Sequence, residues 1–236
     1  MLSCRIADIL VEVPTAGDMD SRCREYRVAD TGIPSIVIHE ERYRRGVWPT
    51  DDYSMICYME SGVQFYNSLL QHNGLLLHAS AVELDGKAYL FSGPCGMGKS
   101  THTRIWQQTF GSAAQVFNDD KPALRCLDGK WYAYGTPWCG KDGINQNKKV
   151  PLAGICFLKQ APENKIRQLT PVEAVQRIIS QTRRRFSQLE NLDLMLQIVE
   201  KLALEIPVFE LENRPEPEAA LLSYETMRRK AEEIGL

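Results

Sequence analysis

The chain has 236 residues, of which 44% are hydrophobic and 25% are charged, and its formal net charge is −2. This composition is ordinary for a globular protein with a core, and the near-neutral charge gives no electrostatic reason to expect nucleic acid or a membrane as partner. Seven scattered cysteines without a CxxC pair, and an N-terminus without a signal-peptide pattern, predict reduced thiols and a cytoplasmic location.

The first 73 residues contain one strand signal and one strong helix signal. Residues 34–40 alternate enough for a strand, and we expect residues 1–50 to form a β-rich lead-in packed on the core. From residue 53 to residue 72 apolar side chains recur at helical spacing, and Asn73 followed by glycine is a typical helix stop. We expect residues 51–236 to form one compact catalytic unit.

A hairpin is predicted directly before the most informative motif of the chain. Residues 75–84 form an apolar run rich enough for a buried strand, and Asp85 with Gly86 is a strong two-residue turn signal. Residues 87–93 then form the returning strand. In an ordinary doubly wound nucleotide-binding fold this strand would lie in a parallel sheet, so the hairpin is unusual there.

The remaining elements alternate between strands and helices. The expected order is a helix at 99–108, a strand at 113–120, a hairpin at 123–135, a strand at 151–160, helices at 171–184 and 191–204, a strand at 207–212 and a helix at 216–234. Between them, residues 136–149 form a polar segment that could close over a site. Trp138 would anchor this segment, and Lys141, Lys148 or Lys149 could neutralise charge there, although a plain surface loop fits equally well.

The motif itself is "GPCGMGKS", which fits GxxxxGK[ST] without a mismatch. Phosphates need closely spaced backbone N–H groups, and glycines leave room for their approach, while the following helix N-terminus adds partial positive charge. Lys99 would supply a cation to the terminal phosphates, and Ser100 would offer its hydroxyl to Mg²⁺. The expected nucleotide-binding residues are Gly93, Cys95, Gly96, Met97, Gly98, Lys99, Ser100 and Thr101.

Two aspartates end the strand that follows the loop. One carboxylate at a strand end, here Asp119 or Asp120, is the usual partner of magnesium in such sites. A second carboxylate could accept the proton of a hydroxyl nucleophile. The alternative is a polar turn in which these residues only shape the backbone.

The order of these pieces resembles the C-terminal catalytic domain of HPr serine kinase, whose fold is similar to that of phosphoenolpyruvate carboxykinase. The resemblance covers roughly residues 75–212 and rests on a histidine (His78) in a strand before the hairpin, the G-x-x-G-x-G-K-S loop and the double aspartate. It implies an α/β fold with a mixed β-sheet core, a phosphate loop and flanking helices. In this family a hairpin before the loop is expected.

The resemblance also implies roles for individual residues. Lys99 and the loop amides would hold the phosphates of ATP, Ser100 and Asp119 would hold Mg²⁺, and Asp120 would be the base, with His78 tuning its protonation. Thr101 departs from the family pattern, because HPr kinases carry an acidic residue there.

We therefore expect a kinase that transfers the γ-phosphate of ATP to a hydroxyl. The acceptor would be a serine or threonine of a peptide or protein, such as a ribosomal-peptide precursor, or a small molecule; Thr101 argues against HPr itself. A nucleotide-binding regulator without transfer, and a phosphoserine phosphorylase or hydrolase, stay open as alternatives, as does a homo-oligomer.

Overall fold

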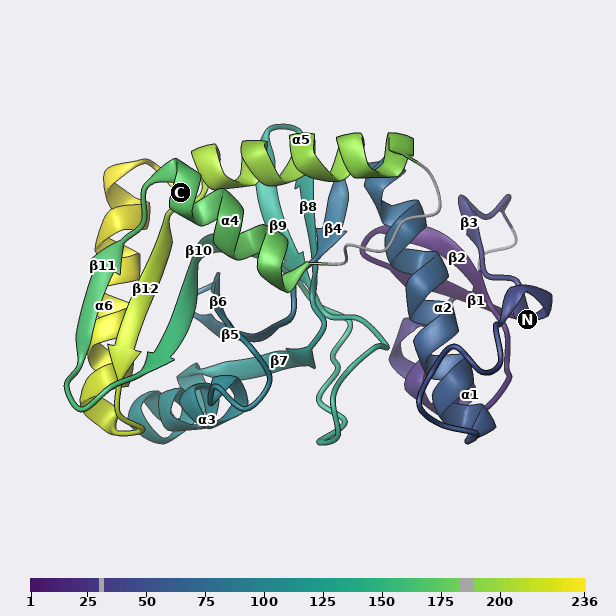
Figure 1. Ribbon diagram of the computed structural model, residues 1–236, viewed down its shortest axis with the longest axis horizontal. Helices are drawn as coiled ribbons and strands as arrows, with labels where there is room; N and C mark the ends of the chain where they lie inside the picture. The colour runs from purple at the N-terminus through teal and green to yellow at the C-terminus, as the bar shows by residue number, and fades with distance from the viewer. Residues whose placement is uncertain (30–31, 183–188) are drawn as a thin grey trace.

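The computed structural model describes residues 1–29, 32–182 and 189–236 (Figure 1). The strands are β1 (Leu2–Ile6), β2 (Ile9–Val13), β3 (Ile36–Val37), β4 (Gly74–Leu76), β5 (Ala79–Leu84), β6 (Lys87–Ser92), β7 (Gln115–Asp120), β8 (Ala123–Leu127), β9 (Lys130–Tyr134), β10 (Lys149–Gln160), β11 (Lys165–Gln168) and β12 (Val208–Asn213). The α-helices are α1 (Met19–Arg22), α2 (Tyr53–Leu69), α3 (Lys99–Phe110), α4 (Pro171–Gln181), α5 (Leu189–Glu205) and α6 (Pro217–Glu233).

The main sheet is mixed, as the sequence predicts. Its strands follow the order β4-β8-β9-β10-β6-β5-β7, and β12 pairs with β10 and with β11. The long strand β10 joins two kinds of pairing: it begins antiparallel to β9 and continues parallel to both β6 and β12. Strands β6, β10 and β12 therefore end at the same edge of the sheet, where ligands bind in open α/β sheets.

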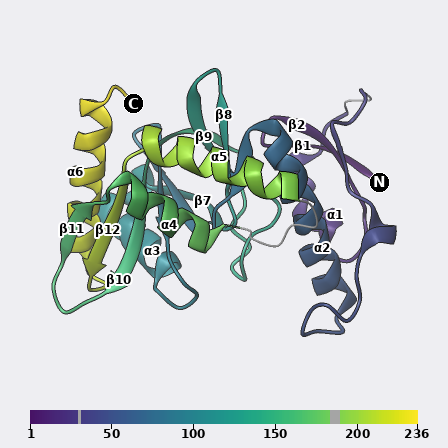
Figure 2. The same ribbon diagram turned by 45° about the horizontal axis from the view of Figure 1, so that its top comes forward.

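Helices cover both faces of this sheet. Apolar side chains of α4 and α5 pack with those of β4, β8 and the first part of β10, and Figure 2 shows α5 lying across β8 and β9. On the other face, α3 and α6 pack against β5, β6, β7 and β12. The α/β fold class, with a mixed sheet core, a phosphate-type loop and flanking helices, is confirmed.

A second, smaller sheet lies on the far side of α2. Strands β1, β2 and β3 form it, and its buried side chains share one apolar cluster with α2 (Figure 1). The sequence patterns did not predict the β1–β2 hairpin, because its turn residues are Ala7 (φ 51°) and Asp8 (φ 60°) rather than the usual glycine. The expected strand at 34–40 is reduced to the two residues of β3. The division at residue 50 stays a prediction.

The predicted turns before and after the loop motif are confirmed. Asp85 (φ 53°) with Gly86 (φ 71°), and Asp128 (φ 48°) with Gly129 (φ 75°), adopt the left-handed conformations of tight hairpin turns. The single strand expected at 75–84 is wrong. The chain breaks at residues 77–78 into β4, which pairs with β8, and β5, which pairs with β6 and β7.

The helices follow the predicted order, with small shifts of their ends. Helix α2 continues into a 3-10 turn (Leu70–His72) and stops at Asn73 (φ 54°), as its sequence predicts. Helix α4 ends at Gln181, and the predicted extension over residues 183–184 lies outside the described residues. Within the part of the chain that the structure describes, every helix is too short or too polar to cross a bilayer.

Candidate functional site

The glycine-rich loop connects the end of β6 to the first residue of α3. Gly93, Gly96 and Gly98 have φ values of 149°, 79° and 95°, which side chains rarely tolerate. A Cβ atom at Gly96 or Gly98 would meet open space, so the obstacle to substitution there is the backbone conformation. The loop therefore exposes its amides beside the N-terminus of α3, an arrangement suited to phosphate.

Lys99 is folded back over this loop and is only 7% exposed. Its ammonium donates hydrogen bonds to the carbonyl oxygens of Gly93 (3.1 Å) and Pro94 (3.3 Å). Burial lowers the pKa of Lys99, against the opposing charges of Asp120 and Asp119. A poorly solvated cation at the mouth of the loop is a ready partner for an anion.

Asp119 faces the loop from the end of β7. It lies opposite Ser80 of β5, and the Ser100 and Ser80 hydroxyls lie near its side chain and lower its pKa. Burial is the largest influence and raises the pKa of Asp119; the neighbouring Asp120 charge adds to the increase, and the two serines oppose it. At 6% exposure, this carboxylate is the most buried acidic group of the candidate site.

Asp120 points to the other side of the strand, where it meets His78. The His78 Nε2 atom lies 2.5 Å from Asp120 Oδ1, and the other ring nitrogen contacts Gln181 Oε1 at 3.1 Å. Burial alone would raise the pKa of Asp120, but the hydrogen bond and charge of His78, aided by Lys121 and Lys99, bring it below its usual value. Contrary to the prediction, His78 lies in the break between β4 and β5 rather than in a strand.

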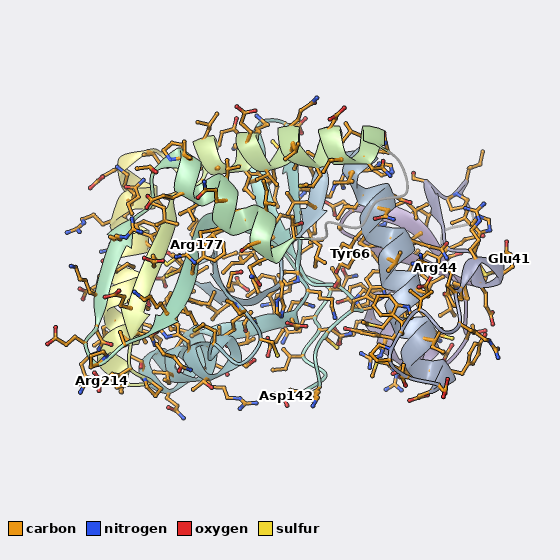
Figure 3. All side chains as sticks on the ribbon, in the orientation of Figure 1. Glu41, Arg44, Tyr66, Asp142, Arg177 and Arg214 are labelled. Atoms are coloured by element: carbon orange, nitrogen blue, oxygen red, sulfur yellow. The ribbon has the colours of Figure 1, made fainter. Side chains whose placement is uncertain are left out.

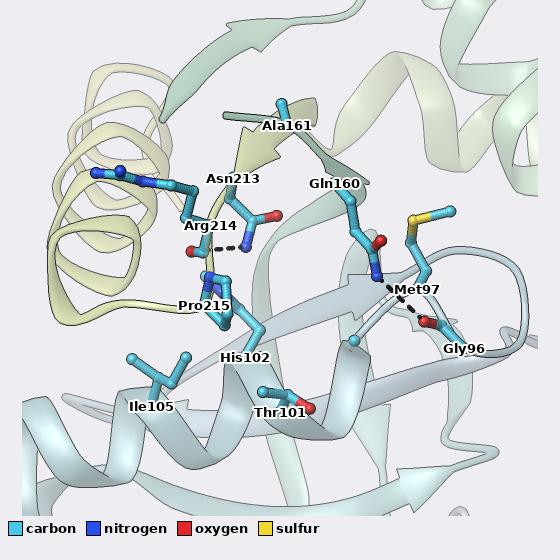
Figure 4. A pocket seen from close by; sticks show the side chains of 11 residues that line it. Gly96, Met97, Thr101, His102, Ile105, Gln160, Ala161, Asn213, Arg214 and Pro215 are labelled. Carbon is cyan, nitrogen blue, oxygen red and sulfur yellow. Dashed lines mark hydrogen bonds between the residues drawn. The ribbon is translucent and has the colours of Figure 1, made fainter. Parts of the chain in front are cut away.

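A cavity of about 400 Å³ opens beside the loop at the ends of the parallel strands (Figure 4). Gln160 at the end of β10 and Asn213 at the end of β12 line it, and Gln160 donates a hydrogen bond to the Gly96 carbonyl (3.4 Å). No sequence pattern indicates either residue. Only the parallel course of β6, β10 and β12 identifies them, and pairing between distant strands has no local sequence signal.

His102 of α3 also lines this cavity and is 1% exposed. Its Nε2 atom contacts Ser223 and Trp106 at 3.2 Å each, whereas its Nδ1 atom has no partner within the described residues. Burial lowers the pKa of His102 to about 3, so the ring is neutral. The Nδ1 atom is itself buried, so this ring belongs to the packing between α3 and α6.

The other predicted loop residues contribute less. Cys95 and Thr101 are exposed, and Met97 packs under Gly93 and lines the cavity. Lys121, which the sequence analysis did not select, lies on the opposite side of Asp120. Its ammonium is 3.6 Å from Asp120 Oδ2 and donates to the Tyr58 hydroxyl at 2.5 Å.

The segment 136–149 is fixed at its start rather than free to close. Trp138 is 1% exposed and stacks on Phe65 of α2, with ring centroids 4.6 Å apart. Lys148 pairs with Glu83, and Lys149 pairs with Asp8 in the turn between β1 and β2, so both ammonium groups are engaged away from the glycine-rich loop. The predicted aromatic anchor is therefore present, but it belongs to the core.

Within residues 1–29, 32–182 and 189–236, histidine, cysteine and carboxylate side chains form no cluster of three that could hold a metal ion. Ser100 and Asp119 nevertheless provide two oxygen ligands of the kind that Mg²⁺ uses together with water and phosphate oxygens. The donor set fits a magnesium ion.

Comparison with known proteins gives two findings. Among solved structures the chain is similar to the Hpr(Ser) kinase/phosphatase from Coxiella burnetii, with 14% identity, a TM-score of 0.37, and coverage of 67% of this chain and 90% of that chain. No curated protein matches the sequence.

The second finding is a family match that spans most of the chain and includes the loop, the two aspartates and His78. It runs from residue 47 to residue 213 and covers more than half of the sequence. The chain therefore belongs to the family described as SynChlorMet cassette protein ScmC.

Proposed function

We propose that this protein is an ATP- and Mg²⁺-dependent kinase that transfers the γ-phosphate to a hydroxyl group. The observation that carries the proposal is the end of β7. There Asp119 lies near Ser100 of the phosphate loop and Asp120 contacts His78 and Lys121, while both carboxylates lie near enough to Lys99 to influence its pKa. Successive side chains of a strand point to opposite faces, so the two adjacent carboxylates contact different groups of residues.

On the donor side, the loop amides and Lys99 bind the phosphates. Lys99 exchanges its two carbonyl partners for phosphate oxygens, which are stronger acceptors because they carry charge. Ser100 and Asp119 would hold Mg²⁺, which would neutralise phosphate charge when bound. The cavity beside Gln160 and Asn213 receives the nucleoside, because it opens directly beside the loop.

On the acceptor side, Asp120 positions the incoming hydroxyl and takes its proton. The hydroxyl oxygen forms a bond to the γ-phosphorus, the bond from that phosphorus to the β–γ bridging oxygen breaks, and ADP leaves. The lowered pKa of Asp120 keeps the carboxylate ionised at neutral pH, so it is ready to accept a hydrogen bond from the hydroxyl. His78 orients this carboxylate through the 2.5 Å contact.

This arrangement favours transfer over simple nucleotide binding. A regulator that only holds a nucleotide needs the loop, Lys99 and one magnesium partner, whereas Asp120 and His78 contribute nothing to that task. Because ordinary structural ion pairs also perturb pKa values, the position of Asp120 and His78 beside the loop supports this role more strongly than the pKa shift of Asp120 does.

A transfer experiment tests the proposal. The protein is incubated with γ-labelled ATP, Mg²⁺ and a degenerate peptide library containing serine or threonine, with Lys99→Ala as the inactive control. We expect Lys99-dependent label on the peptide hydroxyls. Label that appears only as inorganic phosphate, with peptides and small alcohols alike, would contradict a kinase and favour the regulator.

A further inference from the structure

A second, smaller pocket lies on the acceptor side of Asp120. It has a volume of about 80 Å³ and lies between α2 and the turn after β7. Its walls include four aromatic rings, one thioether and one ammonium: Trp48, Tyr58, Tyr66, Trp138, Met59 and Lys121.

The size of this pocket excludes many occupants. Cavities that hold a whole small molecule typically measure about 300–1,000 Å³, and an apolar cavity of about 150 Å³ takes up benzene. A pocket of about 80 Å³ therefore admits a branched aliphatic group but not a ring. Because its walls are mostly apolar, burying such a group there is favourable.

Hydrogen bonds hold the walls in place. The Tyr66 hydroxyl donates to the Lys121 carbonyl at 2.5 Å, and Figure 3 shows Tyr66 reaching from α2 toward the main sheet. The Trp48 indole donates to Glu60 at 2.7 Å, and Arg44 contacts the same carboxylate. Glu60 is 1% exposed, so its two partners hold the loop that carries Trp48 against α2.

Lys121 connects this pocket to the proposed site of transfer. Its ammonium lies 4.7 Å from the centre of the Tyr58 ring and 3.6 Å from Asp120 Oδ2. The Tyr58 hydroxyl accepts a hydrogen bond from Lys121 and donates one to the Cys139 carbonyl at 3.0 Å. An ammonium has three N–H groups, so Lys121 can also donate to an acceptor oxygen. Because Lys121 both lines the pocket and pairs with Asp120, a group in the pocket lies close to a hydroxyl held at Asp120.

We propose that this pocket binds an aliphatic side chain next to the phosphorylated serine or threonine of a peptide, and that Lys121 donates to a backbone oxygen of that peptide. The inference rests on the proposed function and makes it more specific, because it favours a peptide over a small-molecule acceptor. The pocket is too small for a complete small molecule and the right size for one anchor of a longer chain.

Met59 offers a test with a matched control. Met59→Trp fills the pocket, whereas Met55→Trp places the same side chain one helical turn earlier at a position that is 45% exposed. The probes are eight-residue peptides with one serine, flanked on either side by alanine, valine, leucine or tryptophan. Binding is measured by calorimetry with a non-hydrolysable ATP analogue and Mg²⁺, and transfer is measured separately with labelled ATP.

The native protein should bind the valine or leucine peptide about tenfold more tightly than the alanine peptide, the range expected for a small apolar group in a fitted pocket. Met59→Trp should remove this preference, and Met55→Trp should preserve it. Met59→Ala should move the preference toward the larger tryptophan peptide.

Three results separate the two proposals. Peptide binding with the expected preference but without transfer would support the pocket and contradict the kinase. Transfer to all peptides at equal rates, unaffected by Met59→Trp, would overturn the pocket and leave the kinase standing. Equally tight binding of the alanine, valine and leucine peptides to the native protein would also overturn the pocket.

Discussion

The two sides of the β7 end are built in different ways. On the donor side, backbone amides and glycine conformations form the phosphate loop within one short stretch between β6 and α3. On the acceptor side, side chains converge from distant parts of the chain: His78 precedes β5, Tyr58 lies on α2 and Lys121 follows β7. In the function that we propose, the donor side recognises phosphate, which is the same in every nucleotide, whereas the acceptor side can change with the substrate.

The pKa shifts of the two aspartates also differ between the two sides. The pKa of Asp119 is raised, chiefly by burial, while the pKa of Asp120 is lowered because His78 and two lysines outweigh its burial. Without a bound cation, burial disfavours the ionised form of Asp119, whereas His78 and the two lysines favour the ionised form of Asp120. In the proposed function, Asp119 would bind a metal ion and Asp120 would accept the hydroxyl proton.

The largest expected effect concerns the acceptor side alone. Asp120→Asn should reduce phosphotransfer by about 10³-fold, within the range typical of removing a general base, and leave ATP affinity within about twofold. Single-turnover transfer and calorimetry measure the two quantities. Normal turnover in this variant would remove Asp120 from the transfer step.

On the donor side, Lys99→Ala should weaken both ATP binding and transfer. The loss of one charged contact to the phosphates should cost about 10²-fold or more. Lys99→Arg keeps the charge but is bulkier, and it should recover only part of the binding. Unchanged ATP affinity in Lys99→Ala would contradict phosphate binding by the loop.

Within the loop, the backbone should matter more than the side chains. Gly96→Ala places a side chain on a residue with φ 79°, and a strain of about 1–2 kcal/mol should lower ATP affinity by roughly tenfold. Cys95→Ala changes an exposed side chain next to it and should have almost no effect. Equal losses in the two variants would show that the Cys95 side chain also contributes.

The smallest expected effects are on stability, and they have opposite signs. Folding raises the pKa of Asp119, so the folded state favours the protonated carboxyl group. The stability that this group contributes is complete below the unfolded pKa and is lost as the pH rises through the folded pKa. Asp119→Asn should therefore stabilise the ligand-free protein at pH 7 by about 1 kcal/mol, or about 2–4 °C.

For Asp120 the sign reverses. Its lowered pKa contributes stability above the unfolded pKa, and this is lost as the pH falls through the folded pKa. Asp120→Asn should destabilise the protein at pH 7 by about 1 kcal/mol, and both differences should shrink near pH 3. Thermal unfolding at pH 7 and pH 3 measures them; shifts of the same sign would contradict the electrostatic division.

The predictability of the site follows the same division. The loop could be read from Gly93 to Ser100 because phosphate binding requires particular residues at fixed spacing within one segment. The aspartate pair was visible because it ends a strand. Lys121 and Tyr58 were not, since their meeting depends on how α2 packs beside the turn after β7.

The fold shows a similar limit. Hairpins with an Asp-Gly turn were predicted correctly, whereas the β1–β2 hairpin with its Ala7-Asp8 turn has no local signal. The break at His78 was hidden inside a continuous apolar run, because residues on both sides of it are buried in different parts of the same sheet. Periodicity reports burial, and it does not report which strand a segment pairs with.

A magnesium titration tests the central claim most directly, namely that Asp119 serves the donor side and Asp120 the acceptor side. ATP binding is measured at increasing Mg²⁺ concentrations for the native protein, Asp119→Asn and Asp120→Asn. We expect Asp119→Asn to need at least about tenfold more Mg²⁺, the usual cost of removing a metal's supporting carboxylate, and Asp120→Asn to match the native protein. An equal shift in both variants, or a shift only in Asp120→Asn, would contradict the claim.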